Sequence, residues 1–113
     1  MGEVLDKTKK VLSSMALNNG ECLAPTMVAS WMDDNISKFE LRNTKVVSCE
    51  NFSAISISAE SDDIVLQKEK IKSFCNISSV CDEFIFSRVD SGTLKIEFII
   101  RLKDILGETN EQS

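Results

Sequence analysis

Apolar positions recur at helical spacing, every three or four residues, through about the first forty residues of the chain. The spacing predicts one amphipathic helix from Glu3 to Leu17 and a second from Pro25, the only proline, to about Glu40. Proline suits the first turn of a helix because its φ is already helical and its missing N–H would have no partner there. Between the helices, Asn18-Asn19-Gly20 tolerates a left-handed backbone, so we expect the first helix to stop there.

After the second helix the apolar period changes to two, as in strands that bury one face. Residues 41–49 are rich in β-branched side chains, and in residues 52–59 isoleucine and alanine alternate with serine. The two segments predict an antiparallel hairpin that turns at Glu50-Asn51. No glycine lies in this turn, so the turn type stays open.

A second hairpin is predicted near the C-terminal end, from residues 82–89 and 94–103. The turn between them contains Gly92, which can supply a positive φ. The alternation is clearest in the last strand of the chain. Its inward side chains are expected to be Leu94, Ile96, Phe98, Ile100 and Leu102.

The segment between the hairpins predicts a third helix. Glu60-Ser61-Asp62-Asp63 offers a capping serine followed by acids, which are favourable at the positive end of the helix dipole. We expect the helix to run from there to about Phe74. Its pattern is less regular than those of the first two helices, so an extended Ile64-Val65-Leu66 is an alternative.

The predicted order is therefore α-α-β-β-α-β-β. This order indicates an α+β fold: a mostly antiparallel four-stranded sheet with two or three helices packed on one face. Residues 1–106 are expected to form this single domain, and residues 107–113 a flexible polar tail.

Composition adds constraints on location and partners. The 113 residues are 42% apolar and 27% charged, which is ordinary for one globular domain, and no stretch is long and apolar enough for a signal peptide or a membrane span. The net charge of −5 opposes attachment to DNA, RNA or anionic membranes. We expect a small acidic cytoplasmic protein that binds neither membrane nor nucleic acid.

Few residues offer catalytic or metal chemistry. The chain has no histidine, which excludes nucleophiles that depend on a histidine base, and its glycines are too scattered for a phosphate-binding loop. The cysteines lack the paired spacing of a zinc site, and only Cys75 and Cys81 are close enough in sequence for a thiol-based site. We expect no catalytic residue, no metal and no cofactor.

Two groups of residues among the first 63 are candidates for partner binding. Trp31 and Met27 belong to types that are enriched at protein interfaces, although helical spacing favours a core position for Trp31. Glu60, Asp62 and Asp63 lie in a stretch, residues 46–67, without lysine or arginine. A helix start beside a hairpin explains this acidity best, and a site for a basic partner is the alternative.

A third candidate surface lies on the second hairpin. If the alternate apolar residues of both strands point inward, Ile85 and Ile99 must point outward. Paired across the hairpin, they would form an apolar patch on the outer face of the sheet, unless another segment covers that face.

These observations favour a non-enzymatic protein–protein interaction module that acts through a sheet edge or an apolar face. An adaptor, a secretion-type chaperone or a small inhibitor or regulator has these properties, and we expect a protein partner, or a second copy in a homodimer. The alternative is a small-molecule or thiol-based sensor domain that uses Cys75 and Cys81 or a pocket between helices and sheet.

Overall fold

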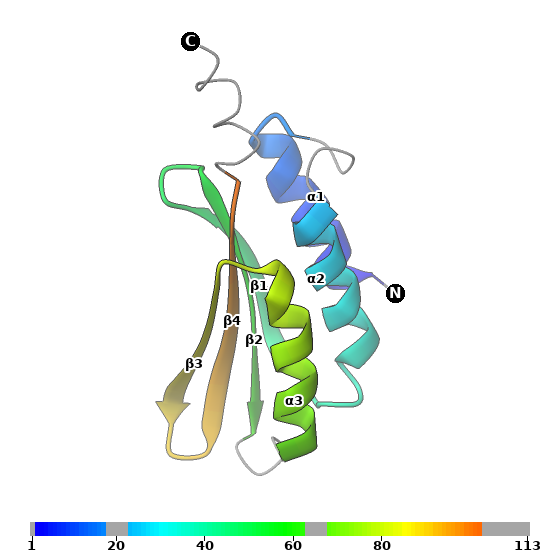
Figure 1. Ribbon diagram of the computed structural model, residues 1–113, viewed down its shortest axis with the longest axis vertical. Coiled ribbons are helices and arrows are strands. Elements are labelled where there is room, and N and C mark those ends of the chain that lie inside the picture. Colours follow the sequence, from blue (N-terminus) through cyan, green and yellow to red (C-terminus); the bar gives the residue numbers. More distant parts are fainter. Residues whose placement is uncertain (1, 18–22, 63–67, 103–113) are drawn as a thin grey trace.

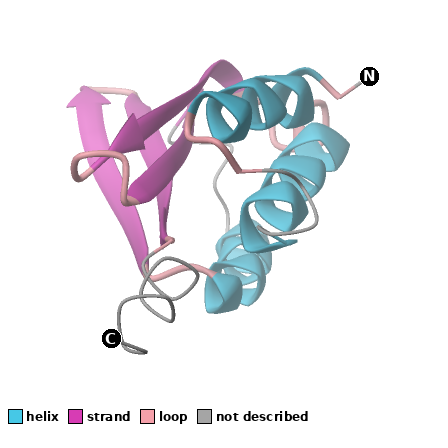
Figure 2. Ribbon diagram, turned by 90° about the horizontal axis from the view of Figure 1, so that it is seen from above, coloured by secondary structure: helices cyan, strands magenta, loops and turns pink. Residues whose placement is uncertain are grey.

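The computed structural model of the chain describes residues 2–17, 23–62 and 68–102. In these residues the elements are α1 (Glu3–Ser14), α2 (Leu23–Asn35), β1 (Arg42–Cys49), β2 (Ala54–Asp62), α3 (Lys68–Ile77), the short 3-10 helix η2 (Ser78–Val80), β3 (Glu83–Asp90) and β4 (Thr93–Arg101). The strands form one antiparallel sheet in the order β1-β2-β4-β3. The helices lie on one face of it (Figures 1 and 2), which confirms the predicted α+β fold and element order.

The core lies between the helices and the inner face of the sheet. Ile96, Phe98 and Ile100 of β4 are at most 3% exposed, as their alternation predicted. Trp31 and Phe74 bring aromatic rings from α2 and α3 onto Phe98, with ring centroids 6.0 and 6.5 Å from it. The cluster of rings thus holds both helices to the centre of the sheet.

Both N-terminal helices end earlier than predicted. α1 ends at Ser14, where Ala16 takes the left-handed conformation (φ 60°) and the Leu17 N–H donates to the Leu12 carbonyl at 2.9 Å. An alanine therefore makes the turn expected of Asn18-Asn19-Gly20, which lies outside the described residues. α2 ends at Asn35 instead of Glu40, and residues 36–40 form a turn in which Glu40 is also left-handed (φ 51°).

The predicted start of the third helix at Ser61 is wrong. β2 continues through Ser61 to Asp62, and α3 begins at Lys68. Ser61 is fully buried, and its hydroxyl donates to the carbonyl of Phe39 at 2.8 Å. Because a partner distant in sequence satisfies this hydroxyl, it does not cap a helix. The alternative extended segment, Ile64-Val65-Leu66, lies outside the described residues.

Neither hairpin turn uses a glycine with a positive φ. In the first, Glu50, Asn51 and Phe52 are all left-handed, with φ between 52° and 66°, so the turn is made without glycine. In the second, Gly92 does not use a positive φ. Instead the carboxylate of Asp90 accepts the Gly92 N–H at 3.0 Å and closes the turn from its side chain.

Candidate functional site

A groove of about 660 Å³ runs along the solvent side of α2. Its size falls within the range of about 300–1,000 Å³ that is usual for binding pockets. α2 forms its floor, α1 one wall and the end of α3 the other. The lining residues are Leu5, Lys9, Leu23, Thr26, Met27, Ser30, Trp31, Asp34 and Ile77.

Asp33 fixes the wall that α1 provides. Its carboxylate oxygens accept the backbone N–H groups of Val4 and Leu5 at 2.9 and 3.0 Å. These N–H groups belong to the first turn of α1, where a negative charge also meets the positive end of the helix dipole. Asp33 therefore joins the end of α2 to the start of α1 and holds Leu5 at the edge of the groove.

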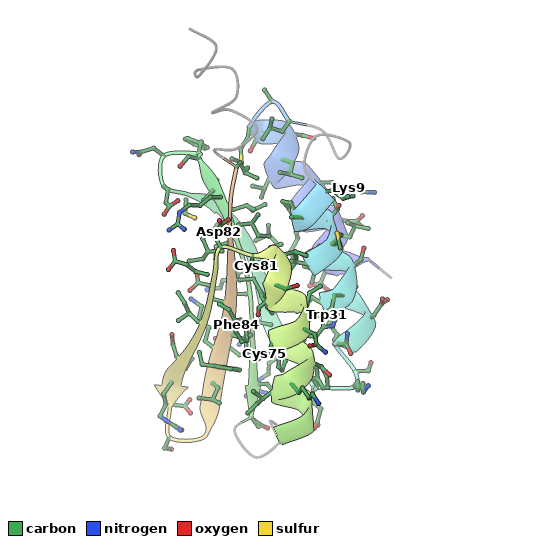
Figure 3. The ribbon with its side chains drawn as sticks, viewed as in Figure 1. Lys9, Trp31, Cys75, Cys81, Asp82 and Phe84 are labelled. Carbon is green, nitrogen blue, oxygen red and sulfur yellow. The ribbon has the colours of Figure 1, made fainter. Side chains whose placement is uncertain are left out.

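Trp31 belongs to the core and to the groove. Its ring lies 5.1 Å from that of Phe74 and 5.9 Å from that of Phe39, yet the residue is only partly buried and lines the groove. It points from α2 toward α3 (Figure 3). Trp31 thus has the core position expected of it, and part of its side chain also lines the groove.

The exposed apolar side chains of the groove lie one helical turn apart on α2. Met27 is 44% exposed and Leu23 is 67% exposed, and both lie on the same side of the helix as Trp31. Sequence reasoning identified Met27 but missed Leu23, because the second helix was expected to begin at Pro25. Its spacing of four residues from Met27 is the signal that could have found it.

Charged groups border the groove on two sides. Lys9 is exposed on α1 (Figure 3), and Asp34 is exposed at the end of α2. Thr26 and Ser30 add hydroxyl groups along the rim. The groove thus has an apolar floor with one cation and one anion at its borders.

The structure places Ile85 and Ile99 on the outer face of the sheet, away from the helices, where we expected them. They are not directly opposite each other, however. The register pairs Ile85 with Glu97 and Glu83 with Ile99, so the two isoleucines are diagonal neighbours separated by carboxylates. The apolar patch predicted from a direct pair is correspondingly interrupted.

Glu60 and Asp62, the acidic candidates, contact side chains of β1. The Asn43 amide donates to Glu60 at 3.0 Å, and Arg42 forms an ion pair with Asp62 at 2.6 Å. Asp63 lies outside the described residues. The two carboxylates are thus partly satisfied within the chain, and neither lies in the groove.

The cysteines offer little thiolate chemistry. Burial raises the pKa of the Cys81 thiol to about 12, and burial followed by the nearby Glu50 carboxylate raises the pKa of Cys49. Cys75 is exposed on α3. In residues 2–17, 23–62 and 68–102 no group of histidine, cysteine and acidic residues could hold a metal ion.

Within the described part of the chain, no helix combines the length and the apolar character that crossing a bilayer requires. Comparison of the chain with protein-family models, with curated proteins and with solved structures gives no match.

Proposed function

We propose that this protein is a non-enzymatic interaction module whose groove binds an amphipathic helix of a partner protein. The observation that carries the proposal is the exposed apolar row on α2, Leu23, Met27 and Trp31, walled by Leu5 and Ile77. Helix-in-groove recognition uses apolar anchors of the partner at i, i+3 or i+4, and i+7. A row of apolar side chains along the floor accepts such anchors.

The dimensions of the groove favour a helix. From Leu23 to Asp34 there are eleven residue steps, which at about 1.5 Å per residue extend over roughly 16 Å. Three turns of a partner helix cover the same length. The charges favour a partner that carries a basic side chain near Asp34 and an acidic one near Lys9.

An adaptor, a secretion-type chaperone or a small inhibitor or regulator in the cytoplasm would bind a helix in this way, and self-association into a homodimer is proposed through a different surface. A thiol-based sensor is less well supported, because the raised pKa of Cys81 keeps its thiol protonated near neutral pH. A small-molecule ligand in the groove is the second candidate, supported by the volume of about 660 Å³.

The proposal is tested by titrating the isotope-labelled full chain with a model peptide. The peptide is helical, with leucine at i, i+3, i+4 and i+7 and with lysine and glutamate outside this stripe; its control has the same composition in scrambled order. Amide resonances of Leu5, Met27, Trp31 and Ile77 should shift with the amphipathic peptide only. Met27→Glu should abolish the shifts, whereas Val47→Glu, at an equally exposed site on the outer sheet face, should keep them.

Three other results would overturn the proposal of a helix-binding groove. Equal shifts with both peptides would mean that binding depends on composition and not on a helical stripe. Shifts confined to the sheet would assign binding to another surface. Shifts at the groove with a small apolar probe such as 1-anilinonaphthalene-8-sulfonate, but with neither peptide, would favour the small-molecule candidate.

A further inference from the structure

The two edges of the sheet are protected to different degrees. At the β1 edge, the register is irregular between Arg42 and Lys45, Asn43 is left-handed (φ 53°), and the Lys7 ammonium of α1 donates to the Thr44 carbonyl at 2.9 Å. These features interrupt the backbone groups that another strand would need. The β1 edge is therefore a poor template for pairing.

β3 forms the other edge, and among the described elements only β4 contacts it extensively (Figure 1). All its residues from Phe86 to Asp90 are exposed. Phe86 is 39% and Val89 is 51% exposed, the strand contains neither lysine nor proline, and its register is irregular only at its end, between Arg88 and Asp90. A long edge strand with exposed apolar side chains and without these protective residues favours the addition of another strand.

We propose that β3 pairs antiparallel with β3 of a second copy of the chain, on a two-fold axis at Ile85. The proposal names the surface for the self-association proposed above and is independent of helix binding in the groove. Residues that face each other in an antiparallel pair lie on the same face of the sheet. In such a symmetric pair the two-fold axis passes between one residue and its equivalent in the second copy. Moving the axis to the next residue along the strand shifts the pairing of the two strands by two residues.

The Ile85 register is selected by charge and by ring contacts. It sets Asp82, just before β3, opposite Arg88 of the second copy, and the two-fold axis repeats this pair. It also sets Phe84 opposite Phe86 of the second copy on the inner face and Ile85 opposite its own equivalent on the outer face. Figure 3 shows Asp82 and Phe84 in sequence along this edge.

The neighbouring registers are less favourable. Centring on Phe86 would set Asp82 opposite Asp90 of the second copy, which brings like charges together twice. Centring on Phe84 would set Arg88 opposite Val80, beyond the end of the strand, and would lose both ion pairs. Among the three registers, only the one centred on Ile85 pairs opposite charges at both ends.

The proposed dimer has one continuous sheet with four strands from each copy. The floor and one wall of the groove lie on α2 and α1, which pack over β1, β2 and β4, and only Ile77 comes from α3, so pairing at the β3 edge leaves the floor of each groove open. Helix binding and dimer formation can therefore fail separately. If the wild-type protein is monomeric but its Met27 amide resonance still shifts with the peptide, only the dimer is refuted.

The register is tested by disulfide trapping in the full chain. Across the two-fold axis the Cβ atoms of paired residues lie about 4.5–5.5 Å apart, so an Ile85→Cys variant should form a dimer linked through position 85 under mild oxidation. The matched control is Ser87→Cys, on the same strand and face. Ser87 pairs with Glu83 of the second copy, which leaves the two Ser87 positions four residues, or roughly 13 Å, apart.

Peptide mapping should find the link between positions 85 in the Ile85→Cys variant and no link between positions 87 in the control. Equal trapping at both positions would mean random collision, and trapping at 87 alone would mean a different register. Either result overturns the proposal.

Charge reversal tests the same register without new cysteines. Arg88→Glu should raise the dimer dissociation constant at least about tenfold in sedimentation equilibrium, because two attractive pairs become repulsive. Asp82→Arg should act likewise, although it also removes the acceptor of the Arg101 N–H, 2.5 Å away. The double variant should return to within about threefold of the wild type, and failure of this rescue while circular dichroism stays native would overturn the pairing.

Discussion

Asp33, near the end of α2, accepts the backbone N–H of Leu5, at the start of α1, with an oxygen–nitrogen distance of 3.0 Å. The two residues are 28 positions apart in the chain, so this cap is a tertiary contact and not a local one. It joins the two helices that form the floor and one wall of the groove. The cap therefore contributes both to the stability of α1 and to the position of Leu5.

Replacement of Asp33 should destabilise the fold. Asp33→Ala leaves the N–H groups of Val4 and Leu5 without their acceptor, and loss of a helix cap costs about 0.5–2 kcal/mol. Asp34→Ala, one residue later and exposed, should change the free energy of unfolding by less than about 0.5 kcal/mol. Urea denaturation of the two variants measures the difference, and equal midpoints would contradict the role of Asp33.

The periodic parts of the fold could be predicted from the sequence, and contacts between distant residues could not. The alternation in residues 94–102 predicted the face of β4 correctly, because burial of one face imposes a period of two. The local sequence around Asp33 gives no sign that it caps the first helix, and Ser61 was expected to cap the third. Their actual partners, Leu5 and Phe39, are 28 and 22 residues away, and no local pattern indicates them.

The candidate site was predictable to a similar extent. Met27 and Trp31 could be identified from residue type and helical spacing, but the groove depends on how α1 and α3 pack beside α2. Leu5 and Ile77 contribute to it from two other helices. Their place in the groove follows from tertiary packing, which the sequence pattern alone does not specify.

The register of β4 gives a direct stability test. Phe98 is fully buried among aromatic rings, so Phe98→Ala should destabilise by about 3–5 kcal/mol. Lys95 lies on the outer face of the same strand, and Lys95→Ala should cost less than about 0.5 kcal/mol. Chemical denaturation of both variants provides the comparison, and similar losses would refute the register.

Met27 should matter for binding and not for stability. Its side chain is 44% exposed, so Met27→Ser removes little buried surface and should change the free energy of unfolding by less than about 0.5 kcal/mol. The same change should weaken binding of the amphipathic peptide at least about tenfold, since a central apolar anchor site is lost. A large loss of stability would instead identify Met27 as a core residue.

Cys75 and Cys81 should differ in their reactivity toward a thiol reagent. At pH 8 a maleimide should label the exposed Cys75 rapidly in the native protein, while Cys81 should react only on unfolding, because burial raises the pKa of its thiol to about 12. The unfolded state, with an ordinary pKa near 9, ionises first as pH rises. The contribution of Cys81 to stability is therefore complete below pH 9 and is lost progressively between about 9 and 12.

A Cys81→Ala variant should show a weaker fall in stability over the alkaline range than the wild type. Thermal denaturation of both proteins at a series of pH values tests this. Identical profiles for the two proteins would contradict the raised pKa of the partly buried Cys81 thiol.

Single lysine substitutions distinguish pairing at the β3 edge from packing of two outer sheet faces. Ile85 lies at the proposed two-fold axis, whereas Ile99 lies one strand further in, on β4, between Ser56 and Glu83. In Ile85→Lys two ammonium groups would face each other across the axis, so light scattering should report a monomer. The fold should persist, because the new lysine lies opposite Glu97 within its own sheet.

The control variant, Ile99→Lys, should remain a dimer, since edge pairing leaves the outer face of β4 uncovered. The opposite pattern would mean face-to-face packing, and a monomeric wild type would exclude self-association through either surface.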